Sequence, residues 1–136
     1  MAILLDHFIV PSRDPIGSAR SLAGVLGTPW EEARGHFTPV YVNETLTVDF
    51  AQREQFDSHH YCFHVSDAEF DQIFARVQAS GIKYRSSPRG PDDMAVNTRL
   101  GGRNFYWTDR DGHIWEVLTL SYARQQAAAS VGSSAP

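Results

Sequence analysis

A pattern that occurs twice constrains this chain more than any other feature, because the fold has to accommodate two similar units. Residues 7–14 begin with a histidine, continue through mostly apolar residues and end at an aspartate, and residues 60–67 repeat this arrangement. Each run is typical of a strand that ends at an aspartate suited to capping a helix. Apolar residues at helical spacing follow in both halves and stop at Gly27 and Gly81, as at the end of a helix.

More apolar segments follow the predicted helix of each half, separated by turn signals such as Asp111-Gly112. Their composition and length are typical of strands. The chain is therefore predicted to contain two copies of a βαβββ unit. The predicted strands after the helices span residues 37–43 and 46–50 in the first half, and 82–85, 104–108 and 114–120 in the second.

The length of 136 residues and the 42% hydrophobic content are typical of one globular domain. We expect a single domain over residues 1–122, with modules at about 1–55 and 56–122. Residues 123–136 are rich in alanine and serine and have no apolar period. They are therefore expected to form a frayed tail.

The charge and cysteine content argue against several kinds of partner and location. A net charge of -4 without a lysine or arginine cluster is untypical of nucleic-acid binding, and the composition leaves little room for a membrane span. The start, Met1 to Asp6, lacks the basic leader of a secretory signal. Cys62 is the only cysteine, so no internal disulfide can form. A cytoplasmic protein that acts on a small molecule is expected.

The alternation of side chains along the predicted strands indicates which polar residues share a face. Successive side chains of a strand point to opposite sides, and one side has to pack against the helices. In the last predicted strand of the first half, alternation leaves Thr47 and Asp49 opposite an apolar face. Likewise, His60 and His64 lie opposite apolar neighbours, and Glu116 points away from the tryptophan and valine beside it. These polar faces are predicted to converge inside the fold.

Three residues of these faces have the chemistry of a metal site. The internal repeat gives His7 the position that His60 occupies in the second half, and Glu116 shares the inner face with His60. Two imidazoles and one carboxylate leave positions of an octahedral ion open for substrate or water. A single strand histidine is more often a core residue than a ligand, so the prediction depends on all three together. Cys62 also points inward, where a cysteine usually has only a packing role.

Three segments resemble a known family, the vicinal oxygen chelate superfamily, which includes glyoxalases, extradiol ring-cleaving dioxygenases, fosfomycin thiol transferases and bleomycin-resistance proteins. They are Leu-Asp-His-Phe-Ile-Val at 5–10, His-Tyr-Cys-Phe-His-Val at 60–65, and residues 104–116, which end in Asp-Gly-His-Ile-Trp-Glu. The resemblance covers residues 3–122. It implies an α+β fold in which two βαβββ modules form one curved mixed β-sheet around a central cavity.

The resemblance also implies a ligand set, a cofactor and an assembly. Members of the superfamily bind metal through residues that match His7, His60 and Glu116. One divalent metal ion is therefore expected, with Zn, Ni, Mn, Co and Fe as candidates, and Glu116 is the expected catalytic residue. Members of this length commonly pair, with modules of two chains completing each site, so a homodimer is expected.

The sequence leaves a fourth metal ligand open. Asp49 is acidic and on the inner face, but the position that matches the fourth ligand of glyoxalases is Thr45, so Asp49 is expected to support another ligand. A triad without a fourth ligand favours dioxygenase or thiol-transferase chemistry over glyoxalase isomerisation. The fosfomycin enzymes in turn resemble one another in a threonine where this chain has Ile9. The residues predicted to contact substrate or support the ligands are Asp49, Thr47, His64, Asn104 and Tyr106.

Two classes of function agree with these residues. The first is a metal-dependent enzyme, a lyase, dioxygenase or thiol transferase, that acts on a small oxygenated substrate chelated to the ion. The second is a metal-free protein of the bleomycin-resistance type, which binds and sequesters a small molecule. Members of the second class generally lack the three ligands, so the sequence favours the enzyme. A purely structural domain is disfavoured because polar groups on an inner face are costly to bury without a partner.

Overall fold

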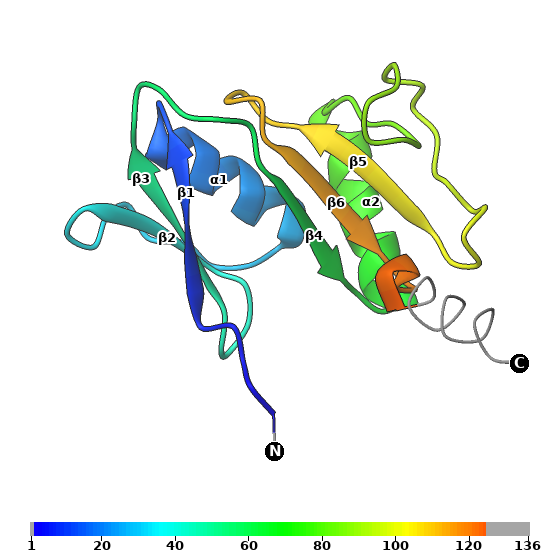
Figure 1. Cartoon of the computed structure of the whole chain (residues 1–136), viewed down its shortest axis with the longest axis horizontal. Coiled ribbons are helices and arrows are strands. Elements are labelled where there is room, and N and C mark those ends of the chain that lie inside the picture. The colour runs from blue at the N-terminus through cyan, green and yellow to red at the C-terminus, as the bar shows by residue number, and fades with distance from the viewer. Residues whose placement is uncertain (1, 125–136) are drawn as a thin grey trace, which may run out of the picture.

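The computed structural model describes residues 2–124 and has an α+β fold, as predicted (Figure 1). The predicted tail lies outside the described residues from residue 125 onwards. No helix in residues 2–124 is long and apolar enough to cross a membrane. The elements are β1 (His7–Ser12), α1 (Pro15–Leu26), β2 (Phe37–Tyr41), β3 (Thr47–Gln52), β4 (His60–His64), α2 (Asp67–Ser80), β5 (Asn104–Thr108) and β6 (Ile114–Leu118).

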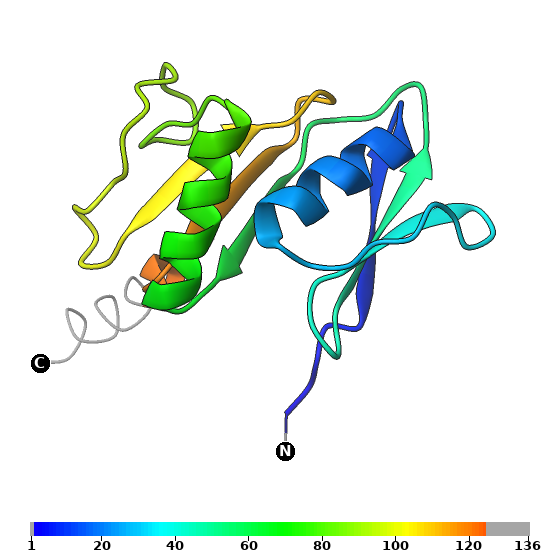
Figure 2. The ribbon, with the colours of Figure 1, turned by 180° about the vertical axis from the view of Figure 1, so that it is seen from behind.

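In the described residues, the strands of each half form a three-stranded sheet, in the orders β1-β3-β2 and β4-β6-β5. In both sheets the central strand pairs in parallel with the first strand of its half and antiparallel with the remaining one. Figure 2 shows α1 and α2 on the same side of the molecule, each against the sheet of its own half. The repeat in the sequence is therefore a repeat of the fold.

Each half has an isolated bridge beside its sheet, and in the second half this bridge stands in place of a predicted strand. Instead of a strand at residues 82–85, an isolated bridge joins Arg85 to β5, and in the first half an isolated bridge joins Trp30 to β2. Prolines stand near both bridges, Pro29 before one and Pro88 after the other. Because proline has no backbone N–H, each of these positions lacks one hydrogen-bond donor for a ladder.

The ends of the helices follow from short-range signals. Asp14 caps α1 as predicted, since its side chain accepts a hydrogen bond from the N–H of Gly17. The prediction that Asp67 caps α2 is wrong. The cap is Ser66, because its hydroxyl and the Glu69 side chain form a reciprocal capping box. Both helices end at the predicted glycines, which adopt the left-handed conformation.

The hydrophobic core lies between the helices and the sheets and contains residues of both halves. Val48 and Phe50 are buried on the helix side of β3, as the alternation predicted. Phe8 of β1 stacks on Tyr61 of β4 with ring centroids 5.0 Å apart, and Phe50 packs against Trp115 of β6. The two modules therefore share apolar contacts although their sheets are separate.

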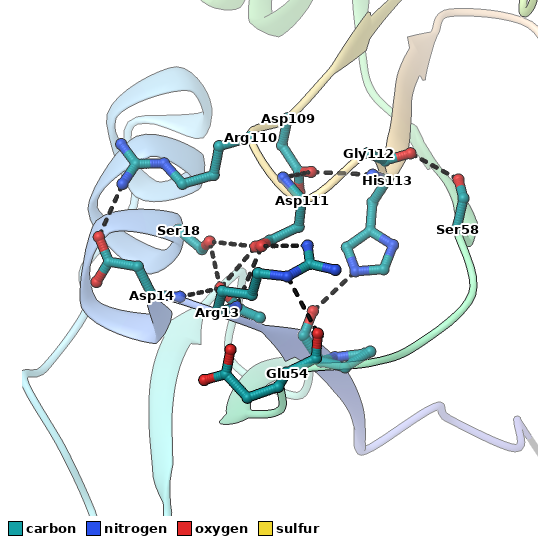
Figure 3. A network of polar contacts seen from close by, with 12 residues as sticks. Arg13, Asp14, Ser18, Glu54, Ser58, Asp109, Arg110, Asp111, Gly112 and His113 are labelled. Carbon is teal, nitrogen blue, oxygen red and sulfur yellow. Dashed lines mark hydrogen bonds and ion pairs between the residues drawn. The ribbon is translucent and has the colours of Figure 1, made fainter.

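A buried polar network also joins the modules (Figure 3). The carboxylate of Asp111, in the turn before β6, accepts hydrogen bonds from the hydroxyls of Ser12 and Ser18 at 2.6 and 3.1 Å and from the N–H of Arg13 at 3.1 Å. Its side chain is only 2% exposed. The donors belong to the first module, so this carboxylate of the second module holds the two together.

His113 adds a second polar link at the same junction. Its ring is fully buried, its Nε2 lies 2.8 Å from the carbonyl oxygen of Pro11, and its Nδ1 accepts a hydrogen bond from the N–H of His59. Because a carbonyl oxygen can only accept, Nε2 carries the proton. The Asp-Gly-His segment thus has a structural role between the modules (Figure 3).

Candidate functional site

The second module carries a buried carboxylate surrounded by hydrogen-bonding groups. Glu116 lies in β6 directly opposite Tyr106 of β5 and is fully buried. Its Oε1 lies 3.1 Å from Nε2 of His60 and accepts a hydrogen bond from the Tyr122 hydroxyl at 2.9 Å. Its Oε2 accepts one from the Asn104 amide at 3.0 Å. The structure therefore brings together on one face the second-half residues that the strand alternation placed there.

The ring of His60 is oriented by the backbone. Its Nδ1 lies 3.0 Å from the carbonyl oxygen of Ile114, to which it donates, so Nε2 is the nitrogen directed at Glu116. A ring N–H held by an oxygen acceptor while the other nitrogen faces the site is the usual arrangement of a metal-binding histidine. The His60 side chain is 44% exposed, so an ion from solvent can reach it.

The first module presents the other predicted histidine. Nδ1 of His7 lies 2.7 Å from Oδ2 of Asp6, and this hydrogen bond is the main cause that raises the pKa of His7. Because the carboxylate engages Nδ1, Nε2 is the nitrogen available to a ligand. Thr47 is the register partner of His7 on β3, and Asp49 lies two residues further along the same face. All four residues line a cavity of about 390 Å³.

The two predicted histidines are not brought together within one chain. Among residues 2–124, no three histidine, cysteine, aspartate or glutamate side chains are grouped closely enough to hold a metal ion. His60 and Glu116 belong to sheet β4-β6-β5 and His7 to sheet β1-β3-β2, and β1 and β4 are not hydrogen-bonded neighbours in the described strands. A single copy of the chain therefore presents the predicted ligand set as two separate halves.

Further polar residues of the second module lie on the same face as Glu116. Nε2 of His64 lies 3.1 Å from the carbonyl oxygen of Thr119, so His64 holds the chain after β6. Burial raises the pKa of Tyr106, which keeps its hydroxyl neutral. Cys62 is an exposed residue, but partial desolvation of its thiol and the nearby Glu116 raise the pKa of Cys62, so the thiol stays protonated at neutral pH. Cys62 thus lacks the thiolate character of a nucleophile.

Tyr122 is the site residue that the sequence did not indicate. It lies beyond β6, where neither strand alternation nor a motif shows the direction of its side chain. Burial and the hydrogen bond to Glu116 raise its pKa, so its hydroxyl remains a neutral donor. Its contact with Glu116 depends on how the chain turns after β6, and no local sequence pattern predicts that turn.

No protein-family model matches this chain, and no curated protein matches it. Solved structures do match. The structure named Oxidase ChaP-H1 is 40% identical, with a TM-score of 0.79 over 89% of this chain and 98% of that chain. Oxidase ChaP-H2 is 36% identical, with a TM-score of 0.79 over 89% and 96%. The fosfomycin resistance protein FosX from Mesorhizobium loti has a TM-score of 0.68 over 93% and 99%, but its 24% identity supports a likeness of fold alone.

The match to the two ChaP oxidases, at 36% and 40% identity, covers nearly their whole length. In addition, the motifs around His7, His60 and Glu116 resemble those of the same superfamily. The fold, the repeated modules and this identity lead to one conclusion: the chain belongs to the vicinal oxygen chelate superfamily.

Proposed function

We propose that this protein is a metal-dependent enzyme that acts on a small oxygenated substrate, with one divalent ion held by His7, His60 and Glu116. The observation that carries the proposal is shared by both histidines. In each, Nδ1 is engaged by an oxygen acceptor, the Ile114 carbonyl or the Asp6 carboxylate, which leaves Nε2 for a metal. Together with the Glu116 carboxylate, this donor set fits Zn, Ni, Mn, Co or Fe.

The complete site is proposed to form in a homodimer, because one chain presents its halves apart. One chain would contribute His7 and its partner His60 and Glu116. Apolar side chains near His7 support this arrangement, since Leu5 is 63% exposed and Ile9 is 50% exposed. Exposed large apolar side chains favour an interaction surface, and a second copy would remove them from water.

Among the reactions of the superfamily, oxidase- or dioxygenase-like chemistry is best supported. The two ChaP proteins, at 36% and 40% identity, are both named oxidases, whereas FosX shares 24%. In addition, Ile9 stands where the fosfomycin enzymes have a threonine. When bound, a divalent ion would act as a Lewis acid that stabilises negative charge on the oxygens of the substrate.

The chain's own side chains would orient that substrate. The neutral hydroxyl of Tyr106 is a hydrogen-bond donor on the same face as Glu116, and its ring centroid lies 6.0 Å from that of His60. Thr47 and Asp49 offer polar groups beside His7 in the other half. We propose that these groups bind the polar edge of the substrate. The rings of Tyr106 and His60 would exclude water from it.

The test is a calorimetric titration of the metal-stripped protein with each candidate ion, and one ion per chain is the expected result. The triple variant His7→Ala/His60→Ala/Glu116→Gln is expected to bind none, because every proposed ligand is gone. His36→Ala, which removes an exposed histidine outside the site, is the matched control and should bind like wild type. Equal binding by wild type and the triple variant would contradict the proposal. Small-molecule binding without any metal would instead favour the alternative function, a metal-free protein that binds and sequesters a small molecule.

A milder loss is expected for Asp49→Asn, about tenfold in metal affinity, because Asp49 is proposed to support the ligands and not to bind the ion directly. Its charge is one cause of the raised pKa of His7, and asparagine removes that charge while keeping the shape. The same titration measures the effect, with Glu44→Gln in the neighbouring turn as an exposed acidic control. A loss as complete as that of Glu116→Gln would make Asp49 a fourth ligand and indicate a glyoxalase-like site.

A further inference from the structure

We propose that Tyr122 is a positioning residue that holds the Glu116 carboxylate in the orientation needed to bind a cation. The inference rests on the proposed function and adds to it a residue outside the family motifs. The two side chains are in direct contact, since the Tyr122 hydroxyl donates to Oε1 of Glu116 at 2.9 Å. Tyr122 would act through Glu116 and not on the substrate.

The carboxylate of Glu116 is held at both oxygens. Tyr122 donates to Oε1 and Asn104 donates to Oε2, so rotation of the carboxylate would break at least one hydrogen bond. Both donors are neutral, and they orient the group without cancelling its charge. In the part of the chain that the structure describes, the ion-pair partner of Glu116 is His60. The result is a fully buried carboxylate that is oriented by neutral donors and lies beside His60, the other proposed ligand of this module, which favours a bound metal ion.

Tyr122 belongs to a segment that is itself fastened to the sheet. After β6, the N–H of Thr119 donates to the carbonyl oxygen of Arg103 at 3.0 Å, and the Thr119 hydroxyl accepts from the N–H of Arg103 at 2.9 Å. His64 contacts the carbonyl oxygen of the same threonine. These contacts restrict the chain just before Tyr122 and thereby hold its hydroxyl against Glu116.

Tyr122→Phe tests the inference, because it removes the hydroxyl and keeps the ring, which also lines a cavity of about 210 Å³. We expect the affinity for Co²⁺ to fall about tenfold, as for other residues that support a metal ligand. The visible absorption of bound Co²⁺ should also change, because it depends on the coordination geometry. The measurements are calorimetric and spectroscopic titrations of the metal-stripped full chain. The thermal unfolding midpoint without metal should stay close to that of wild type.

Tyr84→Phe is the matched control, since Tyr84 is a buried tyrosine that packs against Phe74 and Phe105 in the core. Its affinity and spectrum should equal those of wild type. An unchanged or tighter affinity in Tyr122→Phe, with an unchanged spectrum, would overturn the inference and leave the proposed function standing. An equal loss in Tyr84→Phe would overturn it as well. If wild type binds none of the candidate ions, Co²⁺ included, the proposed function is wrong and the inference falls with it.

Discussion

A His7→Ala chain refolded together with a Glu116→Gln chain is expected to bind metal, although neither variant binds it alone. In the proposed dimer each site takes His7 from one chain and His60 and Glu116 from the other. A mixed dimer therefore has one site that carries both replacements and one site with every ligand intact. We expect this result because His7 and Glu116 lie on separate sheets of one chain.

The measurement is a metal titration of the co-refolded mixture, with light scattering to establish that dimers are present. A second mixture, His60→Ala with Glu116→Gln, is the matched control. Both of its replacements fall in the second module, so each site of the mixed dimer stays damaged and no binding should return. Failure of the first mixture to bind, under conditions where refolded wild type binds one ion per chain, would show that each site forms within a single chain.

Asp111→Ala is expected to lower the free energy of unfolding by roughly 3 kcal/mol, the usual scale for leaving buried polar groups without a partner. Ser12 and Ser18 are both buried and donate to the Asp111 carboxylate across the module junction. Urea unfolding measures the loss. Asp71→Ala is the control, because Asp71 forms an exposed ion pair with Arg103, which is worth about 1 kcal/mol or less. Equal effects of the two variants would contradict the role of the junction.

The contribution of Asp111 is also expected to depend on pH. Burial acts to raise the pKa of its carboxyl, but hydrogen bonds from Ser12, the backbone of Arg13 and Ser18 outweigh burial, so the pKa lies below the ordinary value of 3.8. The folded state therefore binds the proton less readily than the unfolded state. The stabilisation is fully present above about pH 4 and is lost as the pH falls through the lowered pKa.

The stability difference between wild type and Asp111→Ala should consequently narrow in acid. Urea unfolding of both proteins at a series of pH values from about 7 to about 3 measures it. Replacing Asp71 provides the comparison again, since its exposed carboxylate makes only a small contribution at neutral pH. A difference that stays constant over this range would mean that the ionised carboxylate of Asp111 is not what stabilises the junction.

Local patterns predicted much of this protein correctly. The duplication indicated two modules, and each folds in the same order of strand and helix. Strand alternation placed His60, Asn104 and Glu116 on one face, where they are in contact. Alternation succeeds because the direction of a side chain on a strand depends only on its position along that strand.

Two local predictions failed because a neighbouring residue outweighed the pattern. Ser66 caps α2 in place of Asp67, since its hydroxyl and Glu69 satisfy two backbone N–H groups at once. Residues 82–85 form no strand, since only Arg85 forms a bridge to β5, and Pro88 follows within three residues. In both cases the competing signal was present in the sequence within a few positions.

The features that no local pattern could predict all depend on contacts between distant segments. Tyr122 reaches Glu116 only because the chain turns back after β6, and Asp111 finds its donors in the other module. The separation of His7 from His60 is of the same kind. Strand periodicity determines on which face of its own sheet a residue lies, but the placement of one sheet relative to another depends on core packing and on the junction network. The sequence could therefore propose His7, His60 and Glu116 as ligands, whereas the division of these residues between two separate sheets follows from the packing of the modules.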